Sequence, residues 1–179
     1  MATESLILVD SHDRELGVGE KVSTHVGAGQ LHRALSVFIF NSSGQMLLQR
    51  RAAGKMLWPS FWTNTCCSHP RPGEPLLDAA HRRLREEMGF DCPLQEAFHF
   101  EYHASFENVG SENELDHVFL GRYDGKVSAD PQEASEWKWV DLPSLLEEVR
   151  RHPENYTPWF KIALDRVVEA SRSLPSPRA

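Results

Sequence analysis

The stretch TNTCCSHP, residues 63–70, puts Cys66 and Cys67 side by side, with His69 two places further on. Such a group suggests a redox pair, part of a metal site, or a catalytic thiol beside a metal ligand. Adjacent cysteines form a disulfide only with backbone strain, and the chain has no C-x-x-C, so a redox pair or a four-ligand structural zinc site is disfavoured. A buried structural thiol and a reactive thiol both remain open on these residues alone.

Two other segments carry residue types that bind metals. His25 and His32 stand in STHVGAGQLHRAL, and Glu112 and Glu114 stand in GSENELDHVFLG. If the second segment is extended, both carboxylates project from the same strand face, because side chains alternate along a strand. Taken singly, each of these residues is more often an ordinary surface polar side chain than a ligand.

The segment 75–90, PLLDAAHRRLREEMGF, has the clearest helical pattern. Its apolar residues recur at helical spacing, Pro75 suits the first turn, and Gly89 stands where a C-terminal cap belongs. Arg82 and Glu86 are four apart, as are Arg83 and Glu87, so they read either as surface ion pairs or as part of a site.

The other predicted elements are interspersed strands and helices. We expect strands at 5–10, 34–41, 45–51, 97–106, 114–123 and 136–141. We expect further helices at 143–152 and 158–171, the second with Thr157 as N-cap. We expect residues 52–74 to form a long irregular loop, and loops of this length often carry functional residues. The pattern predicts a mixed sheet covered on both faces, in one domain spanning 1–179 with a disordered tail at 172–179.

Composition narrows the class of protein. The net charge of -7 over 179 residues disfavours general nucleic-acid binding. No stretch approaches the roughly 20 apolar residues of a membrane helix, and MATESLILVD lacks the features of a secretory signal. The odd number of cysteines, three, fits reduced thiols in the cytoplasm.

The predicted helix and its flanks resemble the Nudix signature, G-x5-E-x7-R-E-U-x-E-E-x-G-U, in which U is a bulky apolar residue. The residues that fit are Glu74, Arg82, Leu84, Glu86, Glu87, Gly89 and Phe90. Ser68 replaces the first glycine and Arg83 replaces a glutamate. The resemblance implies an α+β fold, a Nudix-like α/β/α sandwich with a mixed sheet. With a guanidinium where hydrolases have a carboxylate, we expect a diphosphate to be bound without hydrolysis.

Five separate segments, from about residue 5 to about residue 165, resemble type I isopentenyl diphosphate isomerase, a Nudix relative. They are His25 with His32, Cys67 with His69, Glu101 with Tyr102, Glu112 with Glu114, and Thr157 with Trp159. The resemblance implies an isomerase (EC 5.3.3.2) of isoprenoid biosynthesis that interconverts isopentenyl and dimethylallyl diphosphate through a tertiary carbocation.

The resemblance also implies the roles of individual residues. The implied catalytic residues are Cys67, Glu114, Tyr102 and Trp159. The implied diphosphate-binding cations are Lys21, Arg51, Lys55 and Arg83. The implied ligands of one zinc or manganese ion are His25, His32, His69, Glu112 and Glu114. Glu87 matches the ligand of a magnesium ion that is bound with the diphosphate, and Cys66 is expected to be a packing residue.

Two rival functions share some of these features. A Nudix pyrophosphatase acting on a nucleoside diphosphate derivative would use Glu86 and Glu87, but it leaves Cys67 and the histidines without a role. A non-enzymatic metal- or isoprenoid-binding protein would bind metal without turnover. We expect a cytoplasmic monomer whose partner is a small isoprenoid diphosphate, with no nucleic-acid or membrane partner.

Overall fold

A computed structural model describes residues 4–175 of the chain. Its strands are β1 (Ser5–Val9), β2 (Glu15–Glu20), β3 (His32–Phe40), β4 (Met46–Arg51), β5 (Trp62–Thr63), β6 (Cys66–Ser68), β7 (Leu94–Phe106), β8 (Gly110–Arg122) and β9 (Ala134–Val140). Its helices are α1 (Lys21–His25), α2 (Leu76–Met88), α3 (Leu142–Arg151) and α4 (Pro158–Ser171), with a 3-10 turn at Pro153–Asn155.

The strands form one mixed sheet centred on β3. β3 pairs in parallel with β8 along its whole length and antiparallel with β6, while β7 continues the sheet beyond β8. β4 contacts the end of β3 and carries β5 and β9, and β1 joins the start of β3 to β2. The mixed sheet predicted from the sequence is confirmed.

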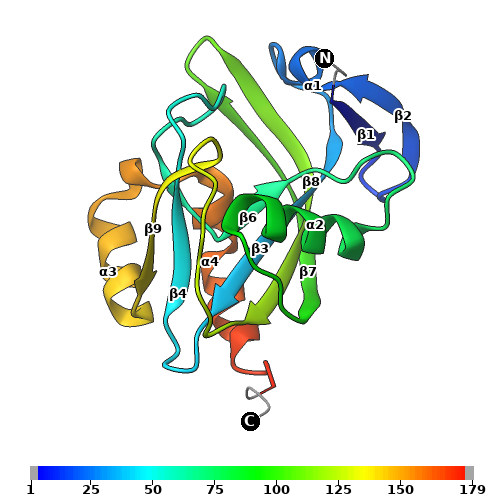
Figure 1. Ribbon diagram of the computed structural model, residues 1–179. Helices are drawn as coiled ribbons and strands as arrows, with labels where there is room; N and C mark the ends of the chain where they lie inside the picture. Colours follow the sequence, from blue (N-terminus) through cyan, green and yellow to red (C-terminus); the bar gives the residue numbers. More distant parts are fainter. Residues whose placement is uncertain (1–3, 176–179) are drawn as a thin grey trace.

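Helices cover both faces of this sheet (Figure 1). α2 packs Ala80, Leu84 and Met88 on one face, against alternate residues of β3 such as Leu35 and Val37. The opposite face holds a second core, in which α3 and α4 contribute Leu145, Phe160, Ala163, Leu164 and Val167. The α+β class and the α/β/α sandwich are therefore confirmed. Among the described residues, no helix combines the length and apolar character needed to cross a membrane.

The helix predicted at 75–90 forms as α2, with its N-cap at Pro75. Gly89 ends it in the left-handed conformation with φ of 74°, and its N–H donates to the carbonyl of Arg85. A Cβ at Gly89 would lie 2.4 Å from the carbonyl oxygen of Ser128, so both the backbone conformation and the space require glycine.

Several details differ from the sequence-based expectation. The loop predicted at 52–74 contains the short strands β5 and β6, and β6 holds both Cys66 and Cys67 in register with β3. β2 and α1 were not predicted. In the described part of the predicted tail, Leu174 is buried against the core, and residues 176–179 lie outside the described residues.

Candidate active site

The carboxylates of Glu112 and Glu114 lie at the start of β8 and face the same side of the sheet, as predicted. Both are largely buried, at 7% and 8% exposure. Glu114 is directly opposite Tyr102 of β7, and the Tyr102 hydroxyl donates to Oε2 of Glu114 at 2.5 Å. The register of the β7–β8 pair thus places a phenol on one of the two carboxylates.

Three elements bring the predicted histidines to these carboxylates. His25 ends α1, His32 begins β3 opposite Glu114, and His69 follows β6. The short helix α1 can lie this close to β8 because Gly110 has no side chain; a Cβ there would be 2.5 Å from the carbonyl oxygen of His25. The histidines and both glutamates each offer a ligand atom, and these five atoms lie within 4.8 Å of one another.

The hydrogen bonds around the rings direct bare nitrogens into this cluster. Nδ1 of His25 lies 2.6 Å from the carbonyl oxygen of Lys21, and Nδ1 of His32 lies 2.8 Å from that of Gln30. Because a carbonyl only accepts, each Nδ1 carries the proton, and in the neutral ring Nε2 is left with a lone pair. This fixed tautomer is the usual arrangement of histidines that bind metals.

The inner nitrogens then converge. Nε2 of His32 and Nε2 of His69 lie 3.2 Å apart, and Oε1 of Glu114 lies 3.0 Å from the second of them. Nε2 of His25 lies 2.9 Å from Oε2 of Glu112. Two imidazole nitrogens held face to face share at most one proton between them, whereas a divalent cation would satisfy both. The three imidazoles and two carboxylates therefore fit a transition metal such as zinc or manganese better than magnesium, which prefers oxygen ligands.

Burial and pairing shift the pKa values of the clustered side chains in different directions. Burial lowers the pKa of His69 to about 4. Burial and the neighbouring Glu114 raise the pKa of Glu112. Burial acts in the same sense on Glu114, but the contacts with His32 and His69 hold the pKa of Glu114 well below its usual value. Glu114 is therefore ionised when the cluster is formed.

Cys67 borders the same pocket from β6. Its Sγ accepts from Nη1 of Arg51 at 3.4 Å, and burial raises the pKa of the Cys67 thiol to about 12. The thiol is therefore protonated at neutral pH and carries a proton that it can give. Cys66, the next residue on β6, points to the opposite face and is fully buried in the core beside α2, as predicted for a packing residue.

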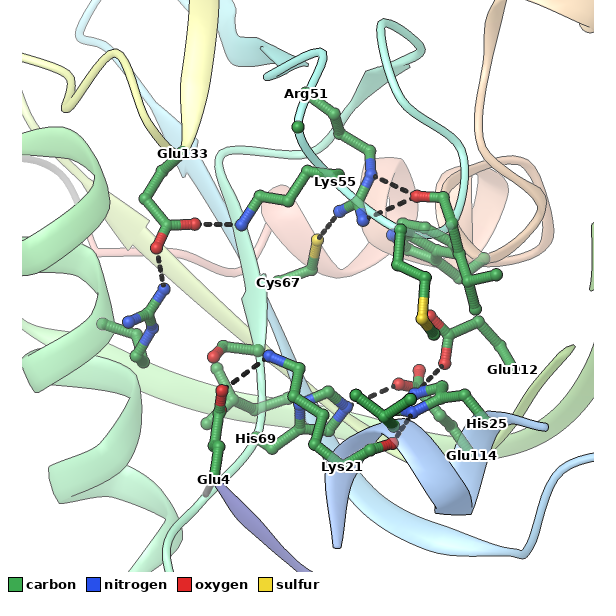
Figure 2. A pocket seen from close by; sticks show the side chains of 18 of the residues that line it. Glu4, Lys21, His25, Arg51, Lys55, Cys67, His69, Glu112, Glu114 and Glu133 are labelled. Carbon is green, nitrogen blue, oxygen red and sulfur yellow. Dashed lines mark hydrogen bonds and ion pairs between the residues drawn. The ribbon is translucent and has the colours of Figure 1, made fainter. Parts of the chain in front are cut away.

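A pocket of about 290 Å³ joins these groups. Figure 2 shows Cys67 and the His/Glu cluster bordering one opening, with Arg51 and Lys55 on the side of the thiol away from the cluster. The lining includes Cys67, Tyr102, Glu112, Glu114, Trp159, His25 and His69, together with Lys21, Arg51, Lys55 and Arg83. His32 is fully buried and does not line the pocket. Its Nε2 lies beside Nε2 of His69, which does.

Trp159 forms an apolar wall of the pocket and is only 3% exposed. Its Nε1 donates to Oδ1 of Asn64 at 3.1 Å, which fixes the plane of the ring. The Arg51 guanidinium carbon lies 5.2 Å from the ring centroid, so the indole already interacts with one cation.

The four predicted cations line the pocket, and each is held by an acceptor. Lys21 pairs with Glu4 at 2.7 Å, Arg51 donates to the carbonyls of Leu57 and Trp58, and Lys55 pairs with Glu133. Arg83 also pairs with Glu133, at 3.0 Å. Glu4 and Glu133 were not predicted as site residues, because their position beside the cations depends on long-range packing that no local spacing indicates.

Glu87 differs from the other predicted site residues, because it neither lines the pocket nor belongs to the group of three histidines and two glutamates. It is 2% exposed and lies behind Arg83. Its Oε1 accepts from Arg83 at 2.8 Å and its Oε2 from Gln49 at 2.8 Å. Each oxygen thus already accepts one hydrogen bond, and the Arg83 guanidinium holds the place on Glu87 where a magnesium ion would otherwise find its negative charge.

Known proteins resemble this chain in fold and sequence. A Deinococcus radiodurans crystal structure superposes with a TM-score of 0.73 at 21% identity, covering 93% of this chain and 98% of the other. A MutT protein from Methanosarcina mazei gives a TM-score of 0.66 at 20% identity over 80% of this chain and 96% of the other. At such low identity these likenesses concern the fold alone.

Sequence relatives define the family more narrowly. The NUDIX domain model matches residues 30–160. Isopentenyl-diphosphate Delta-isomerase 2 of Aromatoleum aromaticum is 52% identical over 171 residues, 96% of this chain and 89% of that protein. The isopentenyl-diphosphate Delta-isomerase of Burkholderia multivorans is 48% identical over 163 residues, 91% of this chain and 92% of that protein. The chain belongs to the Nudix family and, within it, to the isopentenyl-diphosphate Delta-isomerases.

Proposed function

We propose that this chain interconverts isopentenyl diphosphate and dimethylallyl diphosphate by adding a proton at one carbon and removing one at another. The observation that carries the proposal is that Cys67 and Glu114 line a single pocket, in which burial raises the pKa of the thiol and the histidine contacts lower the pKa of the carboxylate. Moving a double bond by one position requires one group that gives a proton and one that takes a proton.

Both groups suit an alkene that has no activating substituent. Protonation of its terminal carbon forms a tertiary carbocation, and loss of a proton from the neighbouring methylene forms the product. The thiol of Cys67 holds its proton at Sγ, and Glu114 accepts at a carboxylate oxygen while Tyr102 donates to Oε2. Because the reaction is reversible, the group that gives a proton in one direction takes it in the other.

The His/Glu cluster would hold one divalent ion, zinc or manganese. Its ligands would be His25, His32, His69, Glu112 and Glu114. Such an ion supplies positive charge that fixes Glu114 and adjusts its basicity. A magnesium ion bound with the substrate diphosphate would use Glu87 once Arg83 turns toward the phosphates.

The cations and the apolar wall of the pocket would bind opposite ends of the substrate. Lys21, Arg51, Lys55 and Arg83 would bind the diphosphate, whose attachment holds the small hydrocarbon end in place. Trp159 would exclude water, which would otherwise trap the carbocation as an alcohol. A cation–π contact contributes on the order of 2 kcal/mol when desolvated, which is a small part of the barrier to protonating an alkene. Most of the lowering of that barrier must therefore come from fixed charges in a pocket that excludes water.

Hydrolysis of the diphosphate is the less favoured activity. The Nudix hydrolases hold magnesium with several glutamates of the helix that α2 matches. Here Arg83 pairs with Glu86 at 2.7 Å and with Glu87 at 2.8 Å, which places one positive charge against two of those carboxylates. The pairing favours a diphosphate that is bound and left intact.

Turnover in heavy water tests the proposed function. After incubation with isopentenyl diphosphate and magnesium, we expect dimethylallyl diphosphate with deuterium in the methyl group formed from the terminal carbon. Mass spectrometry and NMR of the product locate the label. Hydrolysis of nucleoside diphosphate derivatives, with no isomerisation of isopentenyl diphosphate, would instead support the pyrophosphatase.

The carboxylate of Glu133 offers a further prediction, because a diphosphate must compete with it for Lys55 and Arg83. These partners lower the pKa of Glu133 to about 2, against the opposing effect of burial, so the competing charge is present at neutral pH. We expect Glu133→Gln to lower KM for isopentenyl diphosphate by about 3- to 10-fold, the equivalent of about 1 kcal/mol, with kcat little changed. Steady-state kinetics measure both constants.

Glu136→Gln is the matched control, because Glu136 pairs with Arg50, and neither residue lines the pocket. Its KM should equal that of the wild type. A higher KM in Glu133→Gln would show that Glu133 positions the two cations for the diphosphate rather than competing with it.

A further inference from the structure

A second group of possible metal ligands lies on β7 and β8, away from the pocket described above. Glu96, His99 and His117 each offer one ligand atom, and the three atoms lie within 4.8 Å of one another. His117 is 5% exposed, whereas Glu96 and His99 are exposed to solvent. None of the three lines the catalytic pocket.

The pleat of β8 separates the two groups of ligands. Glu112 and Glu114 face one side of the strand, and His117, an odd number of positions further on, faces the other. An ion bound at His117 would therefore lie across the sheet from the catalytic pocket. Its presence or absence can be tested without touching a catalytic residue.

An irregularity in β7 places the exposed residues Glu96 and His99 on the same face of the sheet as His117. In a regular strand, residues three apart point to opposite sides of the sheet. The pairing of β7 with β8 shifts register between Glu96 and Phe98, which inserts one extra residue at Ala97. The extra residue restores Glu96 and His99 to one face, and His99 lies directly opposite His117 in the register.

His117 is already oriented as a ligand. Its Nε2 lies 3.1 Å from Oδ2 of Asp13, and its Nδ1 lies 2.7 Å from Oε1 of Glu96. Asp13 itself is held by Arg33, whose Nε donates to Oδ1 at 2.7 Å. A carboxylate on the outer nitrogen of a histidine fixes the ring and makes the inner nitrogen a better metal ligand.

We propose that Glu96, His99 and His117 bind a divalent transition metal ion of the zinc type, with Asp13 orienting His117. In this site Nε2–H of His117 donates to Asp13, and Nδ1 gives up its contact with Glu96 to bind the metal. Two imidazoles and one carboxylate are a common zinc set, with water in the fourth position. Tetrahedral ligands at about 2.0–2.1 Å from the metal lie about 3.3 Å apart. The contact between Nδ1 of His117 and Oε1 of Glu96, now 2.7 Å, must lengthen to that spacing. The exposed side chains of Glu96 and His99 can move to allow this, while the buried ring of His117 stays fixed.

Zinc stoichiometry tests the site. The full-length wild type and its variants are stripped of metal with a chelator, dialysed against buffered Zn²⁺, and assayed for bound zinc by atomic absorption. We expect two equivalents per chain in the wild type. We expect one in His99→Gln and one in Glu96→Gln, with isomerase activity unchanged in both. The exposed positions are chosen because replacing buried His117 could disturb folding.

His152→Gln is the matched control, since His152 is also an exposed histidine beside a carboxylate, that of Glu154 at 3.2 Å. It should keep both equivalents. Zinc should also raise the melting temperature of the wild type further than that of His99→Gln, because the ion joins β7 and β8 and, through Asp13, the turn between β1 and β2. A zinc content that is the same in the wild type, His99→Gln and Glu96→Gln would overturn the proposal.

Discussion

Cys67→Ala is expected to lower kcat by about 10²- to 10⁴-fold, the usual contribution of one acid–base group, with KM changed by no more than about threefold. In the proposed mechanism the loss falls on kcat, because the thiol would transfer a proton only as the reaction proceeds, while other residues would bind the diphosphate. Burial keeps the Cys67 thiol protonated, with a pKa of about 12, so the wild-type rate should not fall through ionisation of this group between pH 7 and 9. Steady-state kinetics over that range, by conversion of labelled substrate, measure both effects.

Cys66→Ala controls for the loss of a thiol from the same strand. Cys66 is fully buried on the other face of β6, beside Ala80 and Leu84 of α2. Its replacement should reduce stability slightly and leave kcat within about threefold of the wild type, because Cys66 does not line the pocket. Cys67→Ser should behave like Cys67→Ala, since an alcohol is a much poorer proton carrier near neutral pH. Near-full activity in Cys67→Ser would exclude the thiol from the reaction.

The elements predicted from the sequence are those whose pattern extends over many residues. Helix 75–90 and the long strands carry an apolar periodicity that the two cores of the sandwich require, and they formed within a few residues of the predicted bounds. The missed elements are short or glycine-rich. β2 contains Gly17 and Gly19, which have low strand propensity, and it forms because β1 supplies hydrogen-bond partners.

The structure brings most of the predicted site residues to one pocket, while their roles stay predictions; the resemblance over five segments named residues that lie far apart in the sequence and meet only in the fold. What the sequence could not provide is pairing between distant residues that follow no motif. Glu133 reaches Lys55 and Arg83 only because β9 pairs with β4. The bulge at Ala97 has no local signal either, since Ala97 stands in the apparently regular alternation of AFHFEYH.

Glu114→Gln has the second large expected effect, because one side chain would serve as both proton acceptor and metal ligand. The amide keeps the shape of the carboxylate but neither takes a proton nor carries charge. We expect kcat to fall by about 10³- to 10⁴-fold and the metal content of the purified protein to drop. Kinetics and metal analysis on the same preparation separate the two losses.

The matched variant is Glu112→Gln, which removes the neighbouring carboxylate of the same strand face and the partner of His25. The hydroxyl of Tyr102 donates to Glu114 and not to Glu112, so the loss of Glu112 should weaken metal binding while the proposed proton acceptor stays in place. Activity of Glu112→Gln should therefore recover as zinc or manganese is added, whereas Glu114→Gln should stay inactive even when its metal content is restored. If added metal restored both variants equally, Glu114 would be a ligand only, and the proton would have to be taken by another group that faces the alkene.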